Sequence, residues 1–187
     1  MKRLACALLS MLLLLALGGC ACAEPLTQQF KTDYYSLSLP ENWIIDDEDL
    51  EKGRNYEDLG AAYAPELIGL VIEAALVHYE NMSDVSLWRA DEDELQAYID
   101  DVLADYRDDS PEYVKTLWVD GIPFVVIRAE DEDGPYLYAD TMTNGYALEF
   151  YGYVAMSGIK KTLNISDESF ALFEQILSSF KPVLREG

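Results

Sequence analysis

Two acidic residues, Asp140 and Glu149, form the pair in this chain best suited to carboxylate chemistry. They lie on either side of Asn144-Gly145, a dipeptide typical of a two-residue hairpin turn. In the register that this turn sets, the two carboxylates face each other on neighbouring strands. Each would raise the pKa of the other, as in general acid catalysis or cation binding. The ordinary alternative is a pair splayed into water.

Four tyrosines share the predicted face with this pair. Tyrosine offers a large, stiff, amphipathic contact area that suits a protein, peptide or glycan partner. The alternative is that a helix covers the face and leaves only the hydroxyls at its rim. The candidate binding residues are therefore Asp140, Glu149, Tyr136, Tyr138, Tyr151 and Tyr153.

A loop ahead of the second hairpin partly resembles a calcium loop. Asp131, Asp133 and Asp140 would supply carboxylates near positions 3, 5 and 12 of such a loop, with Gly134 near position 6. Position 1 would be Ala129, and strands rather than helices flank the loop. Ca²⁺ is the one cofactor that this pattern indicates, and a solvated hairpin loop is the alternative.

Histidine and cysteine offer little further chemistry. His78 is the only histidine and lies in an apolar run, as a strand residue would. Cys6, Cys20 and Cys22 all lie in or beside the N-terminal leader, so we expect no thiolate nucleophile, disulfide or ordinary zinc site in the folded domain. No serine stands in a nucleophile-elbow motif. We predict no catalytic residue.

The leader predicts an exported protein. Two basic residues precede an apolar run that is too short to span a bilayer, as in a secretory signal. The segment Leu17–Cys20 resembles a lipobox, which makes residues 1–19 the signal peptide and Cys20 the lipidated residue. The protein would then be anchored to the outer face of a bacterial membrane. Cleavage after Ala23 is the alternative and would give a secreted protein.

The net charge argues against several partners. The whole chain carries −22, and loss of Lys2 and Arg3 with the leader leaves 11 basic against 35 acidic side chains, or −24. Such a charge disfavours nucleic acid and anionic lipid. We expect membrane contact only through the N-terminal lipid anchor.

Two successive hairpins must position the candidate residues. Asp120-Gly121 joins runs 113–119 and 122–129, and Asn144-Gly145 joins runs 136–143 and 146–154. In the second hairpin Thr143 faces Tyr146 and Leu137 faces Gly152. Apolar residues occur on both faces of the first hairpin, so a layer is expected on each side of the sheet.

The remaining elements fit one domain over residues 32–184. Residues 33–39 and 67–79 are predicted strands, and residues 20–31 a tether. One helix begins at a capping box of Asp91 and Glu94 and runs to about Tyr106; a second, capped by Ser166, covers 167–180.

The order of these elements, with the end motifs Ser38–Trp43 and Ile176–Pro182, resembles the PsbP-like group. That resemblance implies an α+β fold in which an antiparallel sheet is sandwiched by helices (α/β/α). It also implies a non-catalytic binding or accessory protein, as small exported bacterial lipoproteins often are. We therefore predict such a protein of the cell envelope with an unknown ligand. A carboxylate-dependent hydrolase using Asp140 and Glu149, and a divalent-cation binder, are the alternatives.

Overall fold

Strands are the commonest secondary structure in the computed structural model, which describes residues 25–156 and 162–183. The predicted signal peptide, the lipobox cysteine Cys20 and the alternative cleavage after Ala23 lie outside the described residues. Within them, no helix has the length and apolar character needed to cross a membrane.

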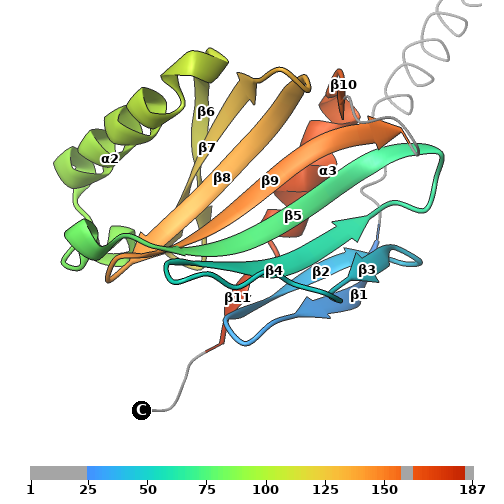
Figure 1. The fold of residues 1–187 in the computed structure, drawn as a ribbon, viewed down its shortest axis with the longest axis horizontal. Coiled ribbons are helices and arrows are strands. Elements are labelled where there is room, and N and C mark those ends of the chain that lie inside the picture. The colour runs from blue at the N-terminus through green and yellow to red at the C-terminus, as the bar shows by residue number, and fades with distance from the viewer. Residues whose placement is uncertain (1–24, 157–161, 184–187) are drawn as a thin grey trace, which may run out of the picture.

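The large sheet has the strand order β3-β4-β5-β9-β8-β7-β6, with β10 paired to β9 (Figure 1). All of its pairings are antiparallel. Its strands are β3 (Ile44–Asp46), β4 (Tyr56–Tyr63), β5 (Ile68–His78), β6 (Glu112–Val119), β7 (Ile122–Glu130), β8 (Pro135–Thr143), β9 (Tyr146–Met156) and β10 (Thr162–Leu163).

Both predicted hairpins are confirmed. Asp120 and Gly121 have φ of 51° and 85°, and Asn144 and Gly145 have φ of 52° and 77°, as a type I′ turn requires. The predicted register between β8 and β9 is confirmed from Leu137–Gly152 to Thr143–Tyr146. Asp140 therefore lies directly opposite Glu149.

A second, three-stranded sheet and one helix cover the first face of the large sheet. This sheet has the order β1-β2-β11, with β1 at Leu26–Lys31, β2 at Tyr35–Pro40 and β11 at Lys181–Pro182. Helix α3 (Asp167–Leu177) lies behind β9 and β5 in Figure 1. The ring of its Phe173 occupies the space beside Gly152, where an added Cβ would come within 2.5 Å of that ring. Ser166 caps α3 as predicted, through a bond from the Ser169 N–H.

The predicted tether over residues 20–31 is wrong at its C-terminal end. Residues 26–31 form β1, which pairs antiparallel with β2. Phe30, 2% exposed, is part of the core beneath the three-stranded sheet. The strand was not predicted because its sequence, LTQQFK, has little apolar alternation. In the structure only one of its six residues is buried.

Helix α2 (Glu92–Asp105) covers only part of the second face. Asp91 and Glu94 form the predicted capping box at its start. The helix packs on buried residues of β7 and β8 and on Ala147 of β9. It lies at the β6–β8 side of the sheet in Figure 1, away from β1 and β2. The same face of β4 and β5 is therefore left without a helix. Short 3-10 turns at Glu80–Met82 and Leu87–Arg89 lead into α2 from β5.

The predicted helix-sandwiched α/β/α fold is wrong. Strands dominate the structure, and a second β-sheet does much of the covering on the face where only a helix was expected. The error has a physical cause in β1 and β4, whose sequences lack the β-branched runs that mark buried strands. Once these strands are missed, helices appear to be the only elements able to cover both faces.

Candidate functional site

Among the residues that the structure describes, the charged side chains that are buried are Asp140 and Glu149. Asp140 is 1% exposed and Glu149 is 5% exposed. They lie on the α2 face of β8 and β9, at the boundary between the covered and uncovered parts of that face. A buried pair of carboxylates needs donors, because an unsatisfied buried charge is costly.

Tyrosine hydroxyls supply these donors. Tyr98 of α2 donates to Asp140 Oδ2. Tyr79 donates to Glu149 Oε1 over 3.0 Å, and Tyr151 donates to Oε2 over 3.3 Å. Sequence reasoning did not identify Tyr79 or Tyr98 as members of the site. The helical spacing of the apolar residues could have indicated Tyr98, because that spacing places it on the face of α2 that packs on the sheet.

Both carboxyl groups have a raised pKa. Burial raises the pKa of Asp140 to about 7, and the nearby Glu149 charge adds to the rise, while the hydroxyls of Tyr98 and Tyr138 oppose it. Burial likewise raises the pKa of Glu149, against hydrogen bonding from Tyr79, Tyr138 and Tyr151. The tyrosine hydroxyls therefore offset only part of the free-energy cost of burying these two carboxylates in their charged form. A neighbouring cation would offset more of that cost.

Helix α2 divides the four predicted tyrosines into two pairs. Tyr136 and Tyr138, 7% and 3% exposed, are core residues beneath the helix. For these two the covering-helix alternative is the correct one. Tyr151 and Tyr153 are only half-buried, and Tyr153 donates a hydrogen bond to Glu73 on β5.

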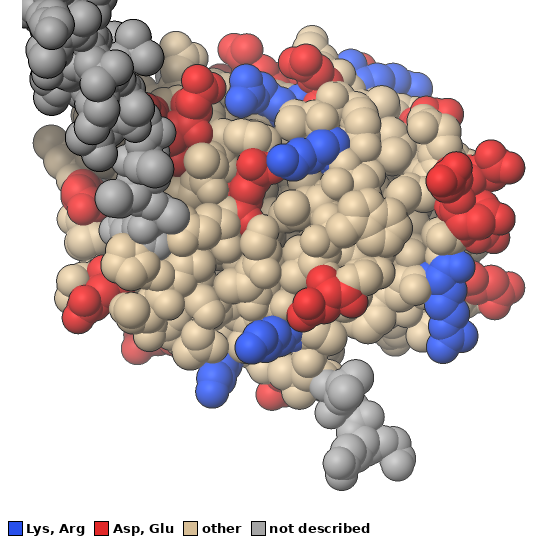
Figure 2. All heavy atoms as spheres, turned by 180° about the vertical axis from the view of Figure 1, so that it is seen from behind, with Lys and Arg blue, Asp and Glu red and all other residues tan. Residues whose placement is uncertain are grey.

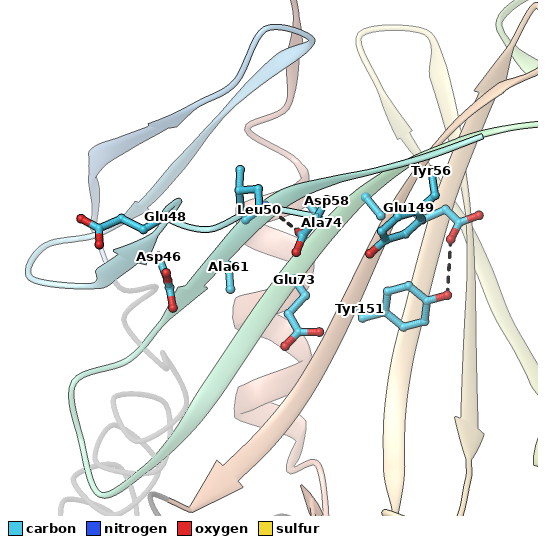
Figure 3. Close-up of a pocket in the computed structure, with 12 residues that line it drawn as sticks. Asp46, Glu48, Leu50, Tyr56, Asp58, Ala61, Glu73, Ala74, Glu149 and Tyr151 are labelled. Carbon is cyan, nitrogen blue, oxygen red and sulfur yellow. Dashed lines mark hydrogen bonds between the residues drawn. The ribbon is translucent and has the colours of Figure 1, made fainter. Parts of the chain in front are cut away.

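Beyond the edge of α2 lies a cavity of about 500 Å³, the open acidic pocket (Figure 3). β3, β4, β5 and β9 contribute to it, together with the β3–β4 connection. Its polar lining consists of Tyr56, Tyr151 and five carboxylates, namely Asp46, Glu48, Asp58, Glu73 and Glu149. Of these residues only Tyr151 and Glu149 were predicted, because β4 was not recognised and its neighbours could not be placed.

The carboxylates of the open acidic pocket affect the pKa of Tyr56, one of the two tyrosines in its lining. The pKa of Tyr56 is raised by partial burial and then by the charges of Asp58, Glu73 and Glu149. None of the ion pairs found among the described residues includes any of the five lining carboxylates. By contrast, Figure 2 shows a face on which Lys and Arg are interspersed with Asp and Glu and uncharged residues cover most of the area.

The predicted calcium ligands are not brought together as a cluster. Asp131 and Asp133 are exposed in the turn between β7 and β8, where Asp131 Oδ1 accepts the N–H groups of Asp133 and Gly134. Asp140 is buried within β8 under α2. Across the described residues, no group of three or more His, Cys, Asp or Glu side chains is arranged to hold a metal ion.

Asp140 and Glu149 do not line the same opening. Glu149 lines the open acidic pocket, whereas Asp140 lines a smaller cavity under α2. The two carboxylates therefore face each other across β8 and β9 without lining a common pocket. His78 ends β5 and stacks on Tyr146 at a centroid distance of 4.4 Å.

Comparisons with known proteins add little to this geometry. No family model matches the chain, and no curated protein matches it. Among solved structures, one similar chain is a protein of Bacteroides thetaiotaomicron VPI-5482, with 14% identity and a TM-score of 0.43. The alignment covers 87% of this chain and 51% of that one, so this chain spans about half the length of that protein. A likeness of this degree supports no inference about function.

Proposed function

We propose that this chain is a non-catalytic, exported binding protein of the bacterial cell envelope, and that the open acidic pocket holds its ligand. The ligand class that fits is a peptide or protein segment bearing Lys or Arg. The N-terminal leader supports export, and its lipobox supports anchoring through Cys20.

The observation that carries the proposal is the lining of the pocket. Five carboxylates from separate segments surround one opening, and none belongs to an ion pair found among the described residues. Such groups raise the local concentration of a cationic partner and speed its association. Tyr56, 45% exposed, and Tyr151 add aromatic faces that favour ammonium and guanidinium groups.

The test is the binding of an oligolysine peptide to the purified protein, measured by calorimetry at two salt concentrations. Because the whole protein is acidic, a matched control must separate the pocket from the general field. One variant carries Glu48→Gln and Glu73→Gln in the pocket. The control carries Glu130→Gln and Glu132→Gln, which remove the same charge from the exposed end of the β7–β8 hairpin.

We expect the pocket variant to bind oligolysine about tenfold more weakly than the control, which corresponds to about 1.4 kcal/mol. Oligoglutamate should not bind either protein. Equal weakening in the two variants would mean that the peptide senses only net charge, and the pocket would then not be the ligand site.

A further inference from the structure

A second cavity, separate from the open acidic pocket, lies between α2, the turn after β5, and β8. Its volume is about 140 Å³. We call it the covered cavity. Its lining consists of Tyr79, Met82, Tyr98, Asp101, Val102, Asp105, Tyr106, Tyr138, Asp140 and Met142. It shares no lining residue with the open acidic pocket.

Asp140 gives the covered cavity an unsatisfied acceptor. The residue is 1% exposed, and its Oδ2 accepts from Tyr98. Its Oδ1 is buried and accepts no hydrogen bond among the described residues. The Tyr138 hydroxyl is near enough to lower the pKa of Asp140 but does not have hydrogen-bond geometry toward this oxygen. A buried carboxylate oxygen without a donor costs free energy that a bound donor would recover. A cationic donor would recover the most, because it also neutralises the charge.

The other lining residues suit a cation rather than an anion. Four tyrosine rings and two methionine thioethers surround the carboxylate, and aromatic faces attract ammonium groups. Asp101 and Asp105, both exposed on α2, add negative charge to the lining. No Lys or Arg is found among the described residues that line the cavity, so the chain itself supplies no counter-ion there.

The volume limits the ligand to a small group. A water molecule takes up about 30 Å³ in the liquid, so the cavity has room for roughly five such units. We propose that the covered cavity binds one primary alkylammonium group, whose N–H groups donate to Asp140 Oδ1 and whose short alkyl chain lies against the tyrosine rings. This proposal does not rest on the function assigned to the open acidic pocket.

The methionines provide a direct test. Met82 and Met142 line the covered cavity, whereas Met156 lies at the end of β9 and lines neither cavity. With the methionine methyl groups labelled with ¹³C, the purified protein is titrated with n-butylammonium chloride at constant ionic strength. n-Butanol serves as the uncharged ligand of similar shape. We expect saturable shifts of the Met82 and Met142 methyl signals, no shift of Met156, and no saturation with butanol.

Two variants complete the experiment. Asp140→Asn keeps the shape but removes the charge, and we expect butylammonium affinity to fall about tenfold or more. Glu73→Gln removes a charge from the open acidic pocket alone and should leave the affinity unchanged. The methyl spectra without ligand show whether each variant is folded, and Tyr98→Phe provides a second cavity variant if Asp140→Asn is not.

Several outcomes would overturn the proposal. Absence of any saturable shift in the wild-type protein would show that the cavity takes no amine. Equal binding of butanol would show an apolar cavity without cation selectivity. If binding survives Asp140→Asn but is lost in Glu73→Gln, the amine occupies the open acidic pocket, which refutes the covered site and favours the proposed function.

Discussion

The sheet face on which α2 packs has two halves, one covered by the helix and one open. Both halves contain tyrosines and carboxylates, but these side chains are buried in one half and partly or fully exposed in the other. In the covered half, under α2, Tyr138 and Asp140 are almost completely buried. In the open half, Tyr153 is half-exposed and Glu73 is exposed. All four residues lie on antiparallel strands of one sheet. The difference shows that the covering helix, not the strand sequence, decides whether a tyrosine and carboxylate pair is core or surface.

The largest effect should come from truncating one tyrosine in each half. Tyr138→Ala removes a ring that packs 4.7 Å from Tyr106 and 5.1 Å from Tyr151, centroid to centroid. We expect a loss of about 3–5 kcal/mol in the free energy of unfolding. Tyr153→Ala should cost about 1 kcal/mol. Urea denaturation measures both, and equal losses would show that α2 does not separate the halves.

The covered half should also make stability depend on pH. Asp140 faces Glu149 across the strands, with Tyr79, Tyr98, Tyr106, Tyr138, Asp101 and Asp105 around it. Its pKa is about 7 when folded and about 3.9 when unfolded, so the folded state binds the extra proton between these values. Stability is therefore greatest near the lower pH and falls as the pH rises toward 7, by at most about 1.4 kcal/mol per pH unit.

Asp140→Asn is the control for this pH dependence. Asparagine stays neutral across the range, so the contribution of Asp140 to the pH dependence disappears. The contribution of Glu149, whose pKa is also raised, remains. Thermal or urea unfolding at several pH values between 4 and 7 should give a shallower slope for the variant. Parallel profiles would mean that Asp140 is ionised throughout, contrary to a buried carboxyl in the covered half.

The features of these two halves that the sequence predicts well depend on residues close together in the chain. Asn144-Gly145 determines the β8–β9 register, because a type I′ turn leaves no other pairing of the strands. The capping box at Asp91 places the start of α2 within one residue. These signals depend on side chains within a few positions of one another, and they were enough to predict that Asp140 faces Glu149.

What the sequence did not predict depends on distant contacts. β4 has a register shift between Asp58 and Gly60, and its sequence, YEDLGAAY, has no clear alternation. Its pairing with β5 is therefore visible only in three dimensions. Without β4, neither the open acidic pocket nor the contribution of Tyr56 could be foreseen. How far α2 extends across the sheet is also a packing result, and no local pattern encodes it.

A smaller effect should come from removing a single hydroxyl on each side of the boundary. Tyr98→Phe deletes the donor to Asp140 Oδ2 and leaves a buried carboxyl with less compensation, at a cost of about 1–3 kcal/mol. Tyr151→Phe deletes a 3.3 Å bond to Glu149, which Tyr79 still satisfies in part, and a 2.7 Å hydrogen bond with the Tyr106 hydroxyl. Tyr106 and Tyr151 are both half-buried, so water can replace the lost partner. We expect less than about 1 kcal/mol there. Urea denaturation at pH 8 would reveal the difference, and a larger loss for Tyr151→Phe would reverse the order of the two halves.

The smallest effect tests whether the open half is truly solvated. Glu73 is exposed on β5 and accepts a hydrogen bond from Tyr153, which the amide oxygen of Gln can also accept. Glu73→Gln removes one charge from a pocket lined by five carboxylates, so any change should be slightly stabilising and within about 0.5 kcal/mol. Urea denaturation at neutral pH measures it. A loss above about 1 kcal/mol in the free energy of unfolding would mean that the Glu73 carboxylate makes buried interactions that the folded state needs. The open half would then be part of the core and not a surface available to a ligand.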